Sequence, residues 1–193
     1  MWTEYVGGRS LANLALVCLT LQPLPASAVN VDGLVFPDDY TVGAEKLQVN
    51  GYGSRLYSFL KVKVYSAALY TPQKSADAQA LINSKAPRVL FLKMRVDSKK
   101  DDAIEAWKHY LRNNCSKPCP VPESRWQPFL NAMATLKEGD TEAYIFTGQG
   151  FELKRNEHTV VKIDDVELSA LVLSGWLGRE PTTPELKAAL LGQ

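Results

Sequence analysis

The residues from Gly51 to Tyr70 constrain the fold of this chain more than any other stretch. They are rich in aromatic and β-branched residues, as a half-buried pair of strands requires. Gly51 and Gly53 suit a turn or a close approach of another backbone segment. We therefore expect a β-hairpin here.

The same stretch places a charged residue, Arg55, among aromatic side chains. Arg55, Tyr57 and Phe59 alternate along the strand and share one of its faces. Burying an unpaired guanidinium is costly, so it needs an acidic partner, a route for its head group into water, or an anionic ligand in a cavity. The hairpin alone leaves all three arrangements open.

The chain has 193 residues, of which 46% are hydrophobic and 22% charged, which is typical of a single globular domain. Hydrophobic periodicity and capping residues then predict an α+β fold with a mainly antiparallel sheet. The expected strands after the hairpin are Arg88–Arg95, Glu142–Thr147, Phe151–Arg155 and Thr159–Ile163. The expected helices are a short one through Leu81 and Ile82 capped by Ser75, Asp102–Arg112 capped by Ser98 and Asp101, one carrying Trp126, Phe129, Leu130 and Met133, Val166–Leu177 capped by Asp164 and Glu167, and a last one capped by Thr183.

The N-terminus has the pattern of a secretory signal peptide. Arg9 precedes an apolar run from Leu11 to Leu21, and small residues follow at Ala26-Ser27-Ala28. The run is too short to cross about 30 Å of hydrocarbon, so we expect no stable membrane span. We predict cleavage near Ala28, leaving a periplasmic or secreted domain of residues 29–193.

Two cysteines remain after such cleavage, Cys115 and Cys119, because Cys18 lies in the signal segment. In an oxidising compartment we expect them to form a local disulfide. A redox-active pair is the alternative, although the spacing is not Cys-x-x-Cys. Whether the short loop serves stability or recognition stays open.

Few other patterns indicate chemistry. His109 and His158 lack ligands at metal-binding spacing, so no metal is expected, and no cofactor motif is present. The glycine pairs lead into strands rather than helices, and no Gly-x-Ser-x-Gly nucleophile motif occurs. The formal net charge of +1 gives no preference for nucleic acid.

The sequence resembles the chalcone isomerase-like family, in particular its small secreted bacterial members. The resemblance rests on Gly51-x-Gly53-x-Arg55, on Lys63-Val64-Tyr65-x-Ala67-x-Leu69-Tyr70 and on Trp176-Leu177-Gly178, and covers about residues 31–192. It implies an open-faced β-sandwich with helices packed on one side of a large sheet.

The resemblance also implies a site. Arg55 matches the arginine that binds the anionic ligand, the strand threonine of the isomerases falls on Tyr65, and a hydroxyl position on the late helix falls on Ser169. The isomerases' helix tyrosine and asparagine fall near Lys100 and Trp107, so the catalytic pair is not matched. Plant relatives of similar fold hold a fatty acid by the arginine and a tyrosine, and Arg55 with Tyr65 offers a related pair.

Three functions follow as hypotheses. The first is a non-catalytic binder of a small amphipathic carboxylate or fatty acid, anchored by Arg55 with Tyr65 and Ser169. The second is an isomerase, an intramolecular lyase of the chalcone isomerase type, with catalytic residues unknown. The third is an envelope protein that acts through a protein partner, with Arg55 paired internally.

Overall fold

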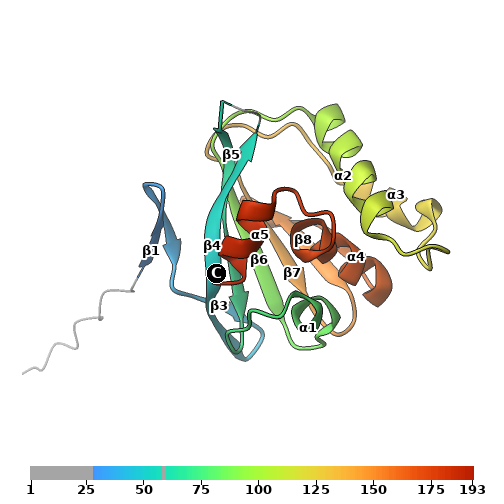
Figure 1. The fold of residues 1–193 in the computed structure, drawn as a ribbon, viewed down its shortest axis with the longest axis horizontal. Coiled ribbons are helices and arrows are strands. Elements are labelled where there is room, and N and C mark those ends of the chain that lie inside the picture. Colours follow the sequence, from blue (N-terminus) through green and yellow to red (C-terminus); the bar gives the residue numbers. More distant parts are fainter. Residues whose placement is uncertain (1–27, 58–59) are drawn as a thin grey trace, which may run out of the picture.

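The computed structural model describes residues 28–57 and 60–193 (Figure 1). Apart from Ala28, the predicted signal peptide of residues 1–28, with Cys18, lies outside the described residues, as does Phe59. Cleavage and secretion therefore stay predictions. Within the described chain, no helix has both the length and the apolar character needed to cross a membrane.

The core of the fold is a seven-stranded antiparallel sheet whose strands follow one another in chain order. The predicted hairpin is confirmed: Arg55 on one strand lies opposite Tyr65 on the next, with an irregularity in the register directly after Arg55. The predicted α+β class is confirmed as well. The strands are β3 (Asp39–Val42), β4 (Glu45–Tyr57), β5 (Val62–Thr71), β6 (Arg88–Met94), β7 (Thr141–Phe146), β8 (Phe151–Arg155) and β9 (His158–Ile163).

The helices lie on one side of this sheet, as expected (Figure 1). The helix α4 is buried along most of its length, and α2 packs against it. The elements are α1 (Ala78–Asn83), α2 (Lys100–Asn114), the 3₁₀ turn η1 (Glu123–Trp126), α3 (Gln127–Asn131), α4 (Val166–Leu177) and α5 (Pro184–Leu190).

A two-stranded hairpin, β1 (Ala28–Val31) and β2 (Leu34–Pro37), lies on the opposite side of the sheet (Figure 1). Its buried side chains Val31 and Phe36 belong to a second apolar cluster, which includes Tyr70 on β5. Arg95 fixes the turn by donating to the carbonyl oxygens of Val31 at 2.9 Å and Asp32 at 2.6 Å. Both faces of the sheet are therefore covered, at least in part.

Three predicted helix caps were wrong. Asp77, not Ser75, caps α1, and Asp165, not Asp164, caps α4 by accepting from the Leu168 N–H at 2.9 Å. Ser98 does not cap α2, because the helix begins one residue later with Lys99 as its N-cap and no side-chain cap; the backbone of Ser98 bonds that of Leu136. Helix α5 is capped by Thr183, as predicted.

Gly51 is required where the C-terminal helix lies on the sheet. A β-carbon at this position would lie 2.2 Å from the Ala189 carbonyl oxygen and 2.5 Å from that of Leu190, both at the end of α5. The side chain of Asn50 donates to the same Leu190 carbonyl at 2.8 Å. The expected close approach of a backbone segment is thus made by α5.

Gly51→Ala should therefore lower stability, because the helix end must move away from β4. We expect a loss of about 1–3 kcal/mol, measured by thermal or denaturant unfolding. Glu45→Ala, at an exposed position on the same strand, is the control and should change little. A Gly51→Ala protein as stable as the wild type would show that α5 does not pack as described.

Candidate ligand-binding cavity

A cavity of about 600 Å³ lies between the inner face of the sheet and helices α2 and α4. Strands β4 to β7 supply its floor and α2 much of its cover. It reaches solvent, because exposed residues such as Tyr57, Val62 and Asp102 line it together with buried ones. Its apolar lining includes Val64, Leu92, Met94, Ala106, Trp107 and Trp176.

Arg55 lies in the wall of this cavity without an acidic partner among the described residues. Its Nη2 donates to the Tyr110 hydroxyl at 3.2 Å, whereas its Nε is buried and has no hydrogen-bond partner. The guanidinium lies 5.9 Å from the ring centre of Tyr65 and 6.0 Å from that of Tyr57, at the limit of a cation–π contact. Internal pairing of Arg55, one of the three arrangements considered, is therefore not observed.

Two tyrosines beside Arg55 present hydroxyl protons to the cavity. The Tyr65 oxygen accepts from the indole N–H of Trp176 at 2.9 Å, and the Tyr110 oxygen accepts from Arg55. Neither of these donors can accept in return. Each tyrosine therefore keeps its own proton to donate, and at Tyr65 the hydroxyl of Thr182 is a further hydrogen-bonding neighbour. Burial raises the pKa of Tyr65 despite the nearby charge of Arg55, which keeps it neutral.

A network of ionised and hydroxyl groups lies further across the sheet. Glu142 on β7 forms an ion pair with Arg155 on β8 at 2.7 Å and accepts from the Tyr144 hydroxyl at 2.9 Å. Burial raises the pKa of Glu142, and Arg155 opposes this rise. Glu142 and Tyr144 line the same cavity as Arg55.

Comparisons with known proteins agree with this architecture. The family model described as chalcone isomerase-like matches residues 28–192. The chain belongs to this family. Among solved structures, the Arabidopsis thaliana fatty-acid binding protein is similar in fold, with a TM-score of 0.66, 14% identity, and coverage of 86% of this chain and 100% of that one. No protein in the curated set matches the sequence.

The structure brings two of the three predicted site residues together in the chalcone isomerase-like domain. Arg55 and Tyr65 are paired across β4 and β5, and both line the cavity. Ser169 is buried on α4, does not line this cavity, and donates its hydroxyl to the Gly150 carbonyl at 3.1 Å. Binding roles for all three stay predictions. Trp107, where the resemblance placed a polar position, supplies an apolar wall.

Sequence reasoning did not assign Glu142, Tyr144 or Trp176 to the site. Glu142 and Tyr144 alternate with Phe146 along one strand, which could have indicated a common face. Trp176 lay within a matched motif, but its contact with Tyr65 joins residues 111 positions apart. In the described part of the chain, no cluster of three potential metal ligands occurs.

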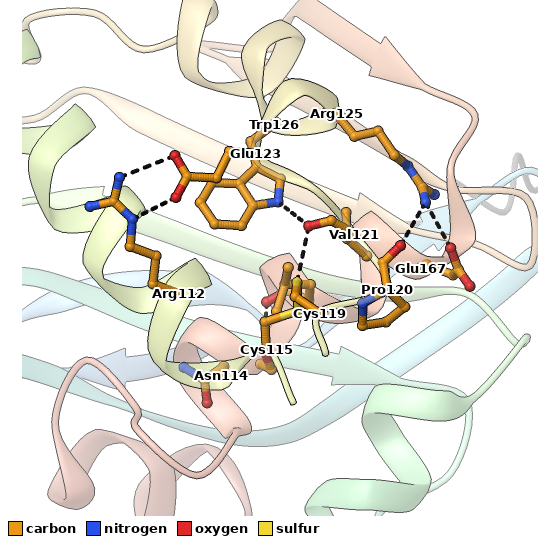
Figure 2. The surroundings of a disulfide bond; sticks show 12 residues. Arg112, Asn114, Cys115, Cys119, Pro120, Val121, Glu123, Arg125, Trp126 and Glu167 are labelled. Atoms are coloured by element: carbon orange, nitrogen blue, oxygen red, sulfur yellow. Dashed lines mark hydrogen bonds and ion pairs between the residues drawn. A yellow bond between two sulfur atoms is a disulfide. The ribbon is translucent and has the colours of Figure 1, made fainter. Parts of the chain in front are cut away.

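The expected disulfide between Cys115 and Cys119 is present at the end of α2 (Figure 2). Cys115 is the C-terminal cap of this helix, and the preceding residue, Asn114, bonds the backbone of Glu180 in both directions. After the loop, the Trp126 indole donates to the Val121 carbonyl at 3.1 Å. The disulfide therefore holds one end of the helix that covers the cavity.

Replacing both cysteines by serine should destabilise the domain, because the unfolded chain regains the freedom of a five-residue loop. The loop-entropy relation gives about 2 kcal/mol, or roughly 4–8 °C in Tm for a domain of this size. The change in Tm is measured by calorimetry of the double variant and of the wild type, each with and without reductant. Reductant should lower the Tm of the wild type only; an unchanged wild-type Tm would contradict a stabilising role.

Proposed function

We propose that this protein binds a small amphipathic carboxylate, such as a fatty acid, in the cavity and does not transform it. The observation that carries the proposal is the Arg55 guanidinium, which lines a largely apolar cavity, lacks a carboxylate partner among the described residues and has a buried, unpaired Nε. A ligand carboxylate would supply the missing charge and acceptors. The hydrocarbon chain would then cover the apolar wall.

The hydrogen-bond directions around Arg55 favour an ionised head group. Tyr65 and Tyr110 both have a proton to donate, and the guanidinium can only donate. A carboxylate only accepts, so it satisfies every one of these groups. An alcohol would satisfy fewer of them and would leave the guanidinium charge without a counter-ion.

Size and fold support the same conclusion. A volume of about 600 Å³ falls within the range of roughly 300–1,000 Å³ that is usual for small-molecule sites. A protein of similar fold bears the name fatty-acid binding protein, which makes fatty acids the first ligands to test. We propose that binding takes place in the periplasm or outside the cell, after removal of the signal peptide.

An isomerase activity has less support. The family's catalytic tyrosine and asparagine are not matched, and the corresponding region of the cavity is occupied by the Trp107 ring, which packs on Trp176 at 4.9 Å and on Phe129 at 4.8 Å. The hydroxyl groups near Arg55 serve as hydrogen-bond donors in our proposal.

Arg55→Gln tests the anchor. Glutamine is also polar but carries no charge, so the affinity for palmitate should fall about 10- to 100-fold. This fall corresponds to the usual free-energy contribution of a hydrogen bond to a charged group. Titration calorimetry of the purified domain, stripped of co-purified lipid, measures it. Arg112→Gln removes the same charge from an exposed position on α2 and should bind as the wild type does. Equal affinities of Arg55→Gln and the wild type would refute the anchor.

Trp176→Phe tests the orientation of the Tyr65 hydroxyl. Without the indole N–H, the Tyr65 hydroxyl is no longer held in the orientation that directs its proton to the ligand carboxylate. Palmitate should then bind about 5-fold more weakly, in line with about 1 kcal/mol for one neutral hydrogen bond. Binding of hexadecan-1-ol should change much less. Trp126→Phe is the matched control, because that indole donates to Val121 away from the cavity. Equal losses for both ligands would indicate altered packing instead.

A further inference from the structure

The cavity has a second polar group in its wall, the carboxylate of Glu142, which the fatty-acid proposal does not use. Only 5% of Glu142 is exposed. Three strand-to-strand steps separate its strand, β7, from β4, which carries Arg55. At a strand spacing of about 4.8 Å, these steps set the two strands roughly 14 Å apart. Arg55 is in one row with Tyr65 and Met94, whereas Glu142 lies opposite Leu92, two residues further along β6.

The two oxygens of Glu142 are not equally satisfied. Oε1 accepts from Arg155 Nε at 3.1 Å and from Nη2 at 2.7 Å. Oε2 accepts from the Tyr144 hydroxyl alone, at 2.9 Å. A carboxylate offers about four acceptor positions, two on each oxygen. One position on Oε2 is therefore left over in a residue that lines the cavity.

The charge of Glu142, in contrast, is already compensated. Arg155 is held in place by a further bond from Nη2 to the Ala132 carbonyl at 3.0 Å. A cationic group on a ligand would gain little from this neutralised pair and would be repelled by Arg155. A plain hydrocarbon chain lying over Oε2 would displace water and leave the acceptor unused. A neutral donor fits this position best.

We propose that the bound acid carries a hydroxyl group on its chain, and that this hydroxyl donates to Glu142 Oε2 while the carboxylate lies at Arg55. The inference rests on the proposed function, because it fixes the direction of the ligand by its carboxylate. It narrows the ligand class from fatty acids to hydroxylated acids or related acids with one neutral donor far from the carboxylate.

The test compares palmitic acid with a series of monohydroxypalmitic acids, in which the hydroxyl moves along the chain. Titration calorimetry with the wild-type domain should show about 5- to 10-fold tighter binding for one or two adjacent hydroxyl positions, and no gain elsewhere. A gain in affinity at only one or two hydroxyl positions would show that the acceptor lies at a fixed distance from the carboxylate site. If no position binds more tightly than palmitic acid, the inference is overturned.

Glu142→Gln is the decisive variant. Arg155 donates two hydrogen bonds to one oxygen, so the amide carbonyl should take that place and leave its NH₂ where Oε2 was. The hydroxyl could then pair only by accepting from this NH₂. The methyl ether of the favoured hydroxy acid, which accepts but cannot donate, should therefore bind more tightly than palmitic acid in Glu142→Gln and show no gain with the wild type. Glu105→Gln neutralises an exposed carboxylate that lines the same cavity and should keep the hydroxyl gain. A gain for the methyl ether with the wild type would overturn the inference, because an ether oxygen cannot donate to Glu142.

A second variant tests the inference independently, in case Glu142→Gln does not fold. Tyr144→Phe removes the one donor to Oε2 and leaves the carboxylate with Arg155, so the hydroxyl gain should be kept or increased. Loss of the gain in a folded Tyr144→Phe protein would overturn the inference. If palmitic acid binds and depends on Arg55 but hydroxylation has no effect, only this inference fails. If neither class of acid binds, the proposed function fails with it.

Discussion

The packing of the Trp176 side chain is the interaction on which the shape of the cavity depends. From α4 its ring packs on Trp107 of α2 and on Tyr144 of β7, each at 4.9 Å between ring centres. Its indole N–H also bonds the Tyr65 hydroxyl of β5. One side chain thus joins two helices to two strands of the sheet. Because aromatic rings are large and rigid, this packing spaces α2 from the sheet and leaves room beside it.

Two arginines, the buried Arg88 and the half-buried Arg55, each have a buried Nε without a hydrogen-bond partner among the described residues, and they differ in the acceptors of their other nitrogens. Arg88 is 3% exposed, and its Nη1 bonds the carbonyl oxygens of Leu81 and Ser84 at the end of α1. Burial lowers the pKa of Arg88 to about 10, yet these two acceptors hold it in place. Arg55 has only the Tyr110 hydroxyl. Arg88 thus has two backbone acceptors where Arg55 has one hydroxyl, and this difference is in line with the anchoring role that we propose for Arg55.

Local patterns predicted the elements well, whereas contacts between distant residues escaped prediction. The Gly51–Tyr70 hairpin and the Thr183 cap follow from neighbouring residues, and both are present. The cap of α4 moved by one residue because Asp165, not Asp164, reaches the Leu168 N–H. The Glu142–Arg155 pair depends on the register between β7 and β8. That register is set by the whole sheet, so the sequence indicated Arg55 but did not place the buried carboxylate of Glu142 in the cavity wall.

The elements around the cavity are fixed by contacts outside it, which favours a preformed site. Helix α2 is held at its C-terminal end by the Cys115–Cys119 disulfide and by Asn114, and β4, which supplies part of the floor, packs at Gly51 against the last helix. A ligand that enters such a cavity need not order its walls, so less of its binding free energy is lost. Arg55 and Glu142 lie on strands of one hydrogen-bonded sheet, so their separation is set by its strand order and register. A rigid site with fixed polar groups selects ligands by the spacing of their own polar atoms, whereas a flexible apolar pocket would select them by size alone.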